Sequence, residues 1–174
     1  MQPPRPLGRQ QAGYGGVRCD VRIHVRTKKE EKKLAKISKE ELIALLNKDL
    51  ALEYTACVQY TQHQGVLKGA MYQSIQKELV LHAQEELAHA TILADQIDYL
   101  GGVPTVEMPT PKTSEDNETM LQQDLEGEND AIARYITRIK QAEELNLYHL
   151  AQQLRNILIV EQEHAMDLEQ ALGK

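Results

Sequence analysis

Two short stretches, Glu86-Leu87-Ala88-His89 and Glu161-Gln162-Glu163-His164, carry the strongest signal in this sequence of 174 residues. Each places a glutamate three residues before a histidine, within a segment whose apolar residues recur at helical spacing. Positions three apart share one face of a helix, so the carboxylate and the imidazole of each stretch can bind at one place. Each stretch therefore predicts a helix with a pair of metal-ligand side chains on its apolar face.

The two stretches belong to an internal repeat. A further glutamate lies 33 residues before each of them, at Glu53 and Glu128. An aspartate four residues before and a tyrosine seven residues after these glutamates also recur, at Asp49, Tyr60, Asp124 and Tyr135. The chain therefore has the pattern of a duplicated helical hairpin, in which each half supplies one Glu and one Glu-x-x-His.

Four helices are expected around these residues. The first begins at Ser38, which forms a capping-box pattern with Glu41. The expected helices cover residues 38–64, 70–100, 114–145 and 147–174. Counted from these starts, the four glutamates lie at a similar depth, about 21–24 Å along their helices. Four such helices would bring the glutamates to one level.

The connection between the second and third helices is long, whereas the other two are short. It begins with Gly101 and Gly102, which end the second helix, and it contains Pro104, Pro109 and Pro111. Glycine and proline at this density indicate an extended segment. We therefore predict an all-α, up-down four-helix bundle with a long crossover between its two helical hairpins.

Carboxylates on an apolar face need partners, because burial of an unpaired charge is costly. Four glutamates and two histidines in a two-fold arrangement suit a pair of divalent ions. Oxygen ligands with some imidazole favour iron or manganese over metals that prefer thiolate. A single Glu-x-x-His would more commonly be a solvated or salt-bridged pair, but the whole duplicated set favours metal binding.

From about residue 38 to residue 172 the sequence resembles the ferritin-like di-iron superfamily, and most closely bacterioferritin. The resemblance implies a ferritin-like bundle with two iron ions per chain, manganese being the alternative, and makes residues 37–174 the di-iron domain. It also implies a role for each ligand. Glu53 and Glu128 would be terminal ligands, one to each metal, Glu86 and Glu161 would bridge the metals, and His89 and His164 would be capping ligands. Tyr60 stands where the family has a tyrosine near the iron, and is the candidate catalytic residue.

The sequence also departs from its relatives. Bacterioferritin binds haem through a methionine directly after the bridging glutamate of the second helix; Leu87 stands there, so we expect no haem. Only ten residues follow His164, so the short fifth helix of 24-subunit cages is not expected. The cysteine-rich module of many rubrerythrins has no counterpart in this sequence.

Several residues near the ligands are candidates for supporting roles at the metal site. Asp49 and Asp124 are expected to accept a hydrogen bond from a ligand histidine on a facing helix and so fix its tautomer. Tyr60 and Tyr135 can be core residues with a bonded hydroxyl, or electron donors to iron. His82, with Glu85, is a candidate for a third, transient iron site.

Other histidines and cysteines attract simpler interpretations. Cys57 is expected to be a small buried apolar residue. His24, His63 and His149 are expected to be ordinary surface or packing residues. Cys19 and Cys57 form no Cys-x-x-Cys motif, so neither a zinc site nor a disulfide framework is indicated.

Charge divides the chain at about residue 36. Residues 1–36 hold ten Lys and Arg against three Asp and Glu, whereas the remainder is acidic and brings the net charge to -6. We expect residues 1–36 to be a flexible basic extension, with residues 21–26 as a short strand. Neither a membrane span nor a signal peptide is expected, and the cytoplasm is the predicted location.

The leading functional hypothesis is a ferroxidase that oxidises Fe(II) with O₂ or H₂O₂ and stores or detoxifies iron, in a homo-oligomer of at least two chains. A rubrerythrin-like or catalase-like peroxidase would use nearly the same ligands and stays open. A shell-forming or DNA-protecting assembly is the other alternative, because a basic segment can hold nucleic acid through phosphate contacts.

Overall fold

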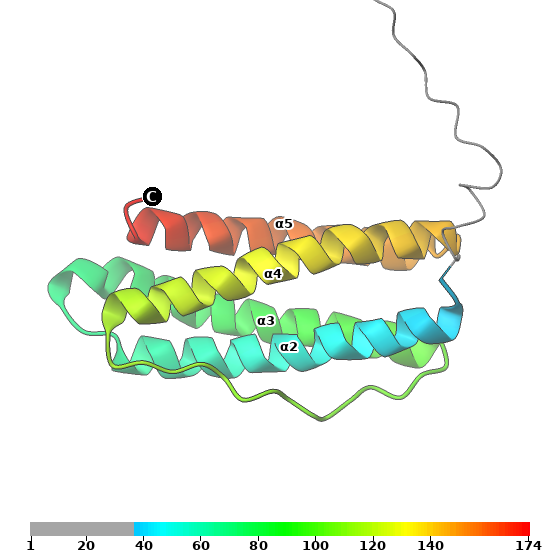
Figure 1. The fold of residues 1–174 in the computed structure, drawn as a ribbon, viewed down its shortest axis with the longest axis horizontal. Coiled ribbons are helices and arrows are strands. Elements are labelled where there is room, and N and C mark those ends of the chain that lie inside the picture. Colours follow the sequence, from blue (N-terminus) through cyan, green and yellow to red (C-terminus); the bar gives the residue numbers. More distant parts are fainter. Residues whose placement is uncertain (1–36) are drawn as a thin grey trace, which may run out of the picture. The chain divides into compact units, whose positions relative to one another are not determined.

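The computed structural model describes residues 37–174, and these form a four-helix bundle (Figure 1). Its helices are α2 (Lys39–Val66), α3 (Gln73–Tyr99), α4 (Asn117–Glu144) and α5 (Tyr148–Ala171), and a short 3₁₀ turn, η1 (Ala70–Tyr72), precedes α3. Residues 37–174 contain no strand. The predicted all-α fold is confirmed, and every expected helix end lies within three residues of the observed one.

The predicted extension, its short strand and His24 lie outside the described residues, so they stay predictions. No helix within residues 37–174 is both long and apolar enough to span a membrane.

Hydrogen bonds at the helix starts explain where α2 and α4 begin. The predicted capping box is present, because the Ser38 hydroxyl accepts from the Glu41 amide at 3.1 Å and the Glu41 carboxylate accepts from the Ser38 amide at 2.8 Å. The start expected for α4 at residue 114 was three residues early. Asp116 is its N-cap, and its carboxylate accepts from the Thr119 amide at 2.8 Å.

The crossover, residues 100–116, lies along α2 (Figure 1). At its beginning, the Asn47 side chain donates to the carbonyl oxygen of Val103 at 3.2 Å and accepts from the amide of Thr105 at 2.7 Å. At its end, the amide of Lys112 donates to the Gln59 side chain at 2.8 Å. Polar residues of α2 thus satisfy backbone groups of the crossover and fix its path across α2.

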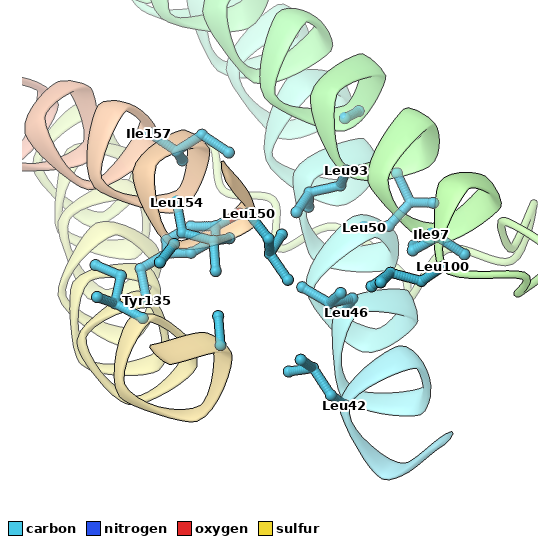
Figure 2. Close-up of a cluster of buried hydrophobic side chains, with 14 of the residues drawn as sticks. Leu42, Leu46, Leu50, Leu93, Ile97, Leu100, Tyr135, Leu150, Leu154 and Ile157 are labelled. Carbon is cyan, nitrogen blue, oxygen red and sulfur yellow. The ribbon is translucent and has the colours of Figure 1, made fainter. Parts of the chain in front are cut away.

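Two apolar clusters fill the bundle, one toward each end. The first, shown in Figure 2, contains Leu42, Leu46, Leu50, Leu93, Ile97, Tyr135, Ile139, Leu150, Leu154 and Ile157. The second contains Tyr60, Leu67, Ile75, Leu79, Met120, Leu121, Leu125 and Leu168. Because the chain has neither Phe nor Trp, aliphatic side chains provide most of this core. Along each helix, the predicted ligands stand between the residues of one cluster and the residues of the other.

Gly102 is packed too closely to carry a side chain. A Cβ atom there would lie 2.5 Å from Cγ2 of Ile43 and 3.2 Å from the carbonyl oxygen of Ile97. We expect Gly102→Ala to lower the free energy of unfolding by about 1–3 kcal/mol, as measured by urea denaturation, because the crossover must move away from α2 and α3.

Gly65→Ala is the matched control. Gly65 lies in α2 with no atom within 4 Å of the added Cβ, and alanine is the better helix former. Its stability should be unchanged or slightly higher. Equal losses in the two variants would contradict the role of close packing at Gly102.

Candidate metal centre

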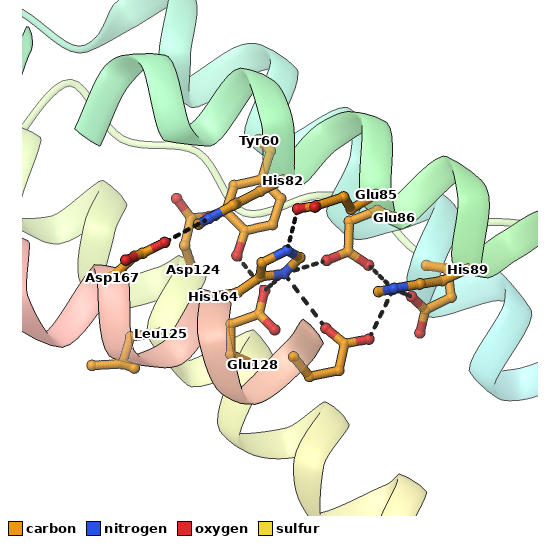
Figure 3. A network of polar contacts seen from close by, with 12 residues as sticks. Tyr60, His82, Glu85, Glu86, His89, Asp124, Leu125, Glu128, His164 and Asp167 are labelled. Carbon is orange, nitrogen blue, oxygen red and sulfur yellow. Dashed lines mark hydrogen bonds and ion pairs between the residues drawn. The ribbon is translucent and has the colours of Figure 1, made fainter. Parts of the chain in front are cut away.

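All six predicted ligands meet in the middle of the bundle, one or two from each helix. Figure 3 labels Glu86, His89, Glu128 and His164 among them. None of the six has more than 4% of its surface exposed. Their ligand atoms form two groups, each within 4.8 Å: Glu53, Glu86, His89 and Glu161, and Glu86, Glu128, Glu161 and His164. Glu86 and Glu161 belong to both groups, and the other four residues to one each.

Both histidines point Nδ1 toward the carboxylates. His89 Nδ1 lies 3.1 Å from Glu161 Oε1, and His164 Nδ1 lies 3.1 Å from Glu86 Oε1. Seven side-chain atoms of the six residues are buried without a hydrogen-bond partner, and they include both Nδ1 atoms and both carboxylate oxygens of Glu161. Buried polar atoms are rarely left unpaired in proteins, so this donor set fits metal ions.

The electrostatics of the centre agree with that fit. Burial raises the pKa of the Glu86 carboxyl well above its usual range, and the nearby Glu161, Glu53 and Glu128 raise it further. Burial alone would lower the pKa of His89, but the close carboxylates of Glu161, Glu53 and Glu86 outweigh it and raise the pKa to about 12. Protons on these groups would therefore compete with a bound cation.

The two tyrosines of the repeat bond across the bundle. Tyr60 of α2 donates its hydroxyl to Glu128 of α4, and Tyr135 of α4 donates to Glu53 of α2 at 2.6 Å. Both rings are buried. Each tyrosine therefore holds one carboxylate of the opposite half. These contacts confirm the bonded-hydroxyl interpretation and leave an electron-donor role untested.

The predicted role of the two aspartates was wrong. Asp49 accepts from Arg138 at 2.7 Å and from Arg134 at 3.2 Å, and neither residue is a ligand histidine. Asp124 accepts from Gln59 at 2.8 Å and lies 2.9 Å from His63 Nδ1. The aspartates belong to α2 and α4, so they meet the neighbouring α4 and α2 and not the histidines of α3 and α5.

His63 is more than an ordinary packing residue. It is fully buried, and its Nε2 lies 3.1 Å from the carbonyl oxygen of Lys112 in the crossover. The internal repeat could have predicted this role of His63. His63 and Gln59 occupy the positions that match Arg138 and Arg134 at an offset of 75 residues, the offset that also relates Asp49 to Asp124.

Glu85 makes the contact with a ligand histidine that was predicted for Asp49 and Asp124. Its carboxylate lies 2.8 Å from Nε2 of His164, on the side of the ring away from the other ligands. His82 is also buried, and its ring stacks on that of His164 with 4.0 Å between the centroids. His82 Nε2 lies 3.4 Å from the carboxylate of Asp167, a contact that the sequence does not predict. Within residues 37–174, His82 and Glu85 do not belong to any further group with metal-ligand geometry.

Three other predictions concern Cys57, His149 and Leu87. Cys57 is half-buried and not fully buried, and burial raises the pKa of its thiol. His149 is exposed, as expected. Leu87, where the resemblance places a haem-binding methionine, is 55% exposed on α3, and the absence of haem stays a prediction.

A cavity of about 250 Å³ lies beside the carboxylates, between α2, α4 and the crossover. Its lining includes buried Glu53, Glu86, Glu128 and Glu161, and exposed Thr110, Lys112 and Asp130. Gly127 also lines it, and no atom lies within 4 Å of the place where a Cβ would stand. The cavity therefore connects the carboxylates with the surface, and an ion or a small oxidant could reach them from this side.

Fold and site together define a class of protein: an all-α bundle in which paired carboxylate and histidine clusters suit a metal site. The sequence model described as "Ferritin-like domain" matches residues 43–174. The chain therefore belongs to the ferritin-like family, as its resemblance predicted.

Two similar proteins with ferritin names agree with this family assignment. The chain is 30% identical over 138 residues to a bacterial ferritin from Paramagnetospirillum magnetotacticum, covering 78% of this chain and 84% of that protein. It is also 30% identical over 128 residues to a bacterioferritin from Brucella melitensis biotype 1, covering 73% and 79% of the two chains.

Solved structures show the same fold. A ferritin-like, diiron-carboxylate protein from Bacillus anthracis str. Ames is 33% identical, with a TM-score of 0.74, and the match covers 78% of this chain and 99% of that chain. A dodecameric thioferritin, the bacterioferritin-related protein from Bacteroides fragilis, is 32% identical with a TM-score of 0.72, covering 79% and 88%. The predicted fold class is confirmed.

The ion pair of Asp49 with Arg138 provides a test of the polar layer beside the centre. We expect Arg138→Leu to lower the free energy of unfolding by about 3–5 kcal/mol in urea denaturation, because it leaves a buried carboxylate without its nearest cation. The double variant Asp49→Leu/Arg138→Leu should recover much of this loss.

Arg155→Leu is the control for this pair. Arg155 bonds Glu143 where both side chains are about 40% exposed, and such surface pairs contribute about 0–1 kcal/mol. A loss in Arg138→Leu as small as that in Arg155→Leu would contradict a structural role for the buried pair.

Proposed function

We propose that this protein binds two ferrous ions between its helices and oxidises them with O₂ or H₂O₂, so that iron is stored or made harmless in ferric form. The observation that carries the proposal is the pair of ligand groups that share Glu86 and Glu161. Two ions held by shared carboxylates would be close enough to give one electron each to a single oxidant. Manganese is the alternative metal.

Each ligand has a role in the proposal. Glu86 and Glu161 would hold both ions, because they belong to both groups. Glu53 and His89 complete one position, and Glu128 and His164 the other. The inward Nδ1 atoms support this assignment, since a neutral imidazole offers its lone pair there when Nε2 carries the proton.

Tyr60 is the proposed catalytic residue, as an electron donor beside the ions. Its hydroxyl contact with Glu128 supports this role, because it brings the ring to a ligand. Tyr135 makes the matching contact with Glu53, so it is the natural comparison for any effect of Tyr60.

We also propose a cytoplasmic location, because a sequence with two cysteines and no disulfide framework is typical of a compartment where thiols stay reduced.

Removal of a shared carboxylate tests the ferroxidase proposal. We expect Glu86→Ala and Glu161→Ala each to abolish rapid Fe(II) oxidation, because each change disrupts both ligand groups at once. Stopped-flow absorbance after aerobic mixing with two Fe(II) per chain measures the rate, and circular dichroism checks that the bundle is intact.

The control is Glu163→Ala, which removes an exposed glutamate two residues after Glu161 on the same helix. It should oxidise Fe(II) at the unaltered rate. Rapid oxidation in folded Glu86→Ala and Glu161→Ala would rule the proposal out.

We also propose that the chain forms a homo-oligomer. The dodecameric state of the related thioferritin supports this, as that protein covers most of this chain. After aerobic loading with excess Fe(II), size-exclusion chromatography with light scattering gives the mass, and elemental analysis gives the iron per chain. Storage predicts tens of iron atoms per chain in a large particle.

About two iron atoms per chain on a small oligomer would contradict storage. Rapid peroxide turnover with that iron content would favour the rubrerythrin-like or catalase-like alternative. A DNA-protecting role rests on residues 1–36, which the structure does not describe, and a salt-dependent shift of DNA by the full chain would be its sign.

A further inference from the structure

The repeat allows the two halves of the metal centre to be compared position by position. An offset of 75 residues relates Glu53 to Glu128, Glu86 to Glu161 and His89 to His164. The ligands themselves are therefore matched, and any difference between the halves lies in what surrounds them. Three such differences exist, and all act in one direction.

The first difference is the hydrogen bond behind the ligand histidine. His164 Nε2 has the Glu85 carboxylate at 2.8 Å, but the position that matches Glu85 is Val160. Within residues 37–174, Nε2 of His89 has no hydrogen-bond partner of this kind. A carboxylate behind a ligand imidazole fixes its tautomer and makes it more basic, and its loss commonly costs 10–100-fold in metal affinity.

The second difference is the charge beside the terminal glutamates. Near Glu53, Asp49 is held by two guanidinium groups, Arg134 and Arg138. Near Glu128, the matching Asp124 is held by an amide and an imidazole, from Gln59 and His63. The half with Glu53 therefore has more fixed positive charge near it, which disfavours a cation there.

His82 adds to the same imbalance. Its ring stacks on His164, and its Nε2 lies 3.4 Å from the carboxylate of Asp167, which stands three residues after His164 on α5. The position that matches His82 is Ile157, an apolar core residue. The half with His164 thus has Glu85 and His82 against its ligand histidine, and the positions that match them, Val160 and Ile157, are apolar.

We propose that the two halves bind metal unequally: the position formed with Glu128 and His164 takes the first ion and holds it more tightly than the position formed with Glu53 and His89. This inference rests on the proposed metal-binding function. It adds the order in which the two ions bind. The cause of this order is the Glu85 carboxylate together with the different charges around Asp49 and Asp124.

Stepwise titration of the metal-free protein with Co(II), followed by calorimetry and visible absorption, tests the proposal without any turnover. We expect two steps per chain that differ at least about tenfold in affinity. His164→Ala should remove the tighter step, and His89→Ala the weaker one. Loss of the weaker step in His164→Ala would overturn the assignment.

Exchange of the matched residues tests the cause. Glu85→Val, which copies Val160, should weaken the first step about 10–100-fold and bring the two steps together. Asp95→Val removes an exposed carboxylate farther along α3 and should leave both steps unchanged. If Glu85→Val does not fold, Glu85→Gln keeps the acceptor oxygen without the charge and should still weaken the first step.

Two equal steps in the unaltered protein, or an unchanged first step in Glu85→Val and Glu85→Gln, would overturn the inference but leave the metal site intact. Failure of the proposed function gives a different result. In that case, Co(II) would not bind, or it would bind equally well to the double variant Glu86→Ala/Glu161→Ala.

Discussion

Burial of four carboxylates and two imidazoles in the middle of an apolar bundle is the constraint on which the rest of the structure depends. Like charges at such short distances oppose one another, and only protons or cations can balance them. The apolar clusters on either side bind the helices together and keep these groups in place. The seven unpartnered ligand atoms show that protein contacts alone do not satisfy the centre. Stability of the bundle and function of the site are therefore linked.

The two-fold repeat organises more than the ligands. Tyr60 and Tyr135 cross between α2 and α4 to the opposite glutamates, and Asp49 and Asp124 bind residues at matching positions of the facing helix. Where the two halves have kept the same residues, the contacts are equivalent. Where they differ, as at Glu85 and Val160, the surroundings of two similar ligand sets become unequal. Differences between the halves of a repeat can therefore give two ligand groups unequal surroundings without changing a ligand.

The crossover contributes to the site although it supplies none of its ligands. Gln59 and His63 bond both to Asp124 and to Lys112, so the same α2 side chains join the polar layer to the crossover. Pro109, Thr110 and Lys112 then line the cavity that reaches the carboxylates. The path of the crossover thus decides which side of the bundle opens toward the centre.

The sequence by itself determined the helices, the long crossover and the six residues that meet in the centre. Helical periodicity is a local pattern of apolar residues, and the repeat is visible from residue spacing alone. It also suggested the tyrosines, though not that each would reach the opposite half. Only the tertiary structure decided the partners of Asp49 and Asp124, the bond from Glu85 to His164 and the burial of His63. These depend on which helix faces which and on how each is rotated about its axis, and a single helix does not encode its neighbour.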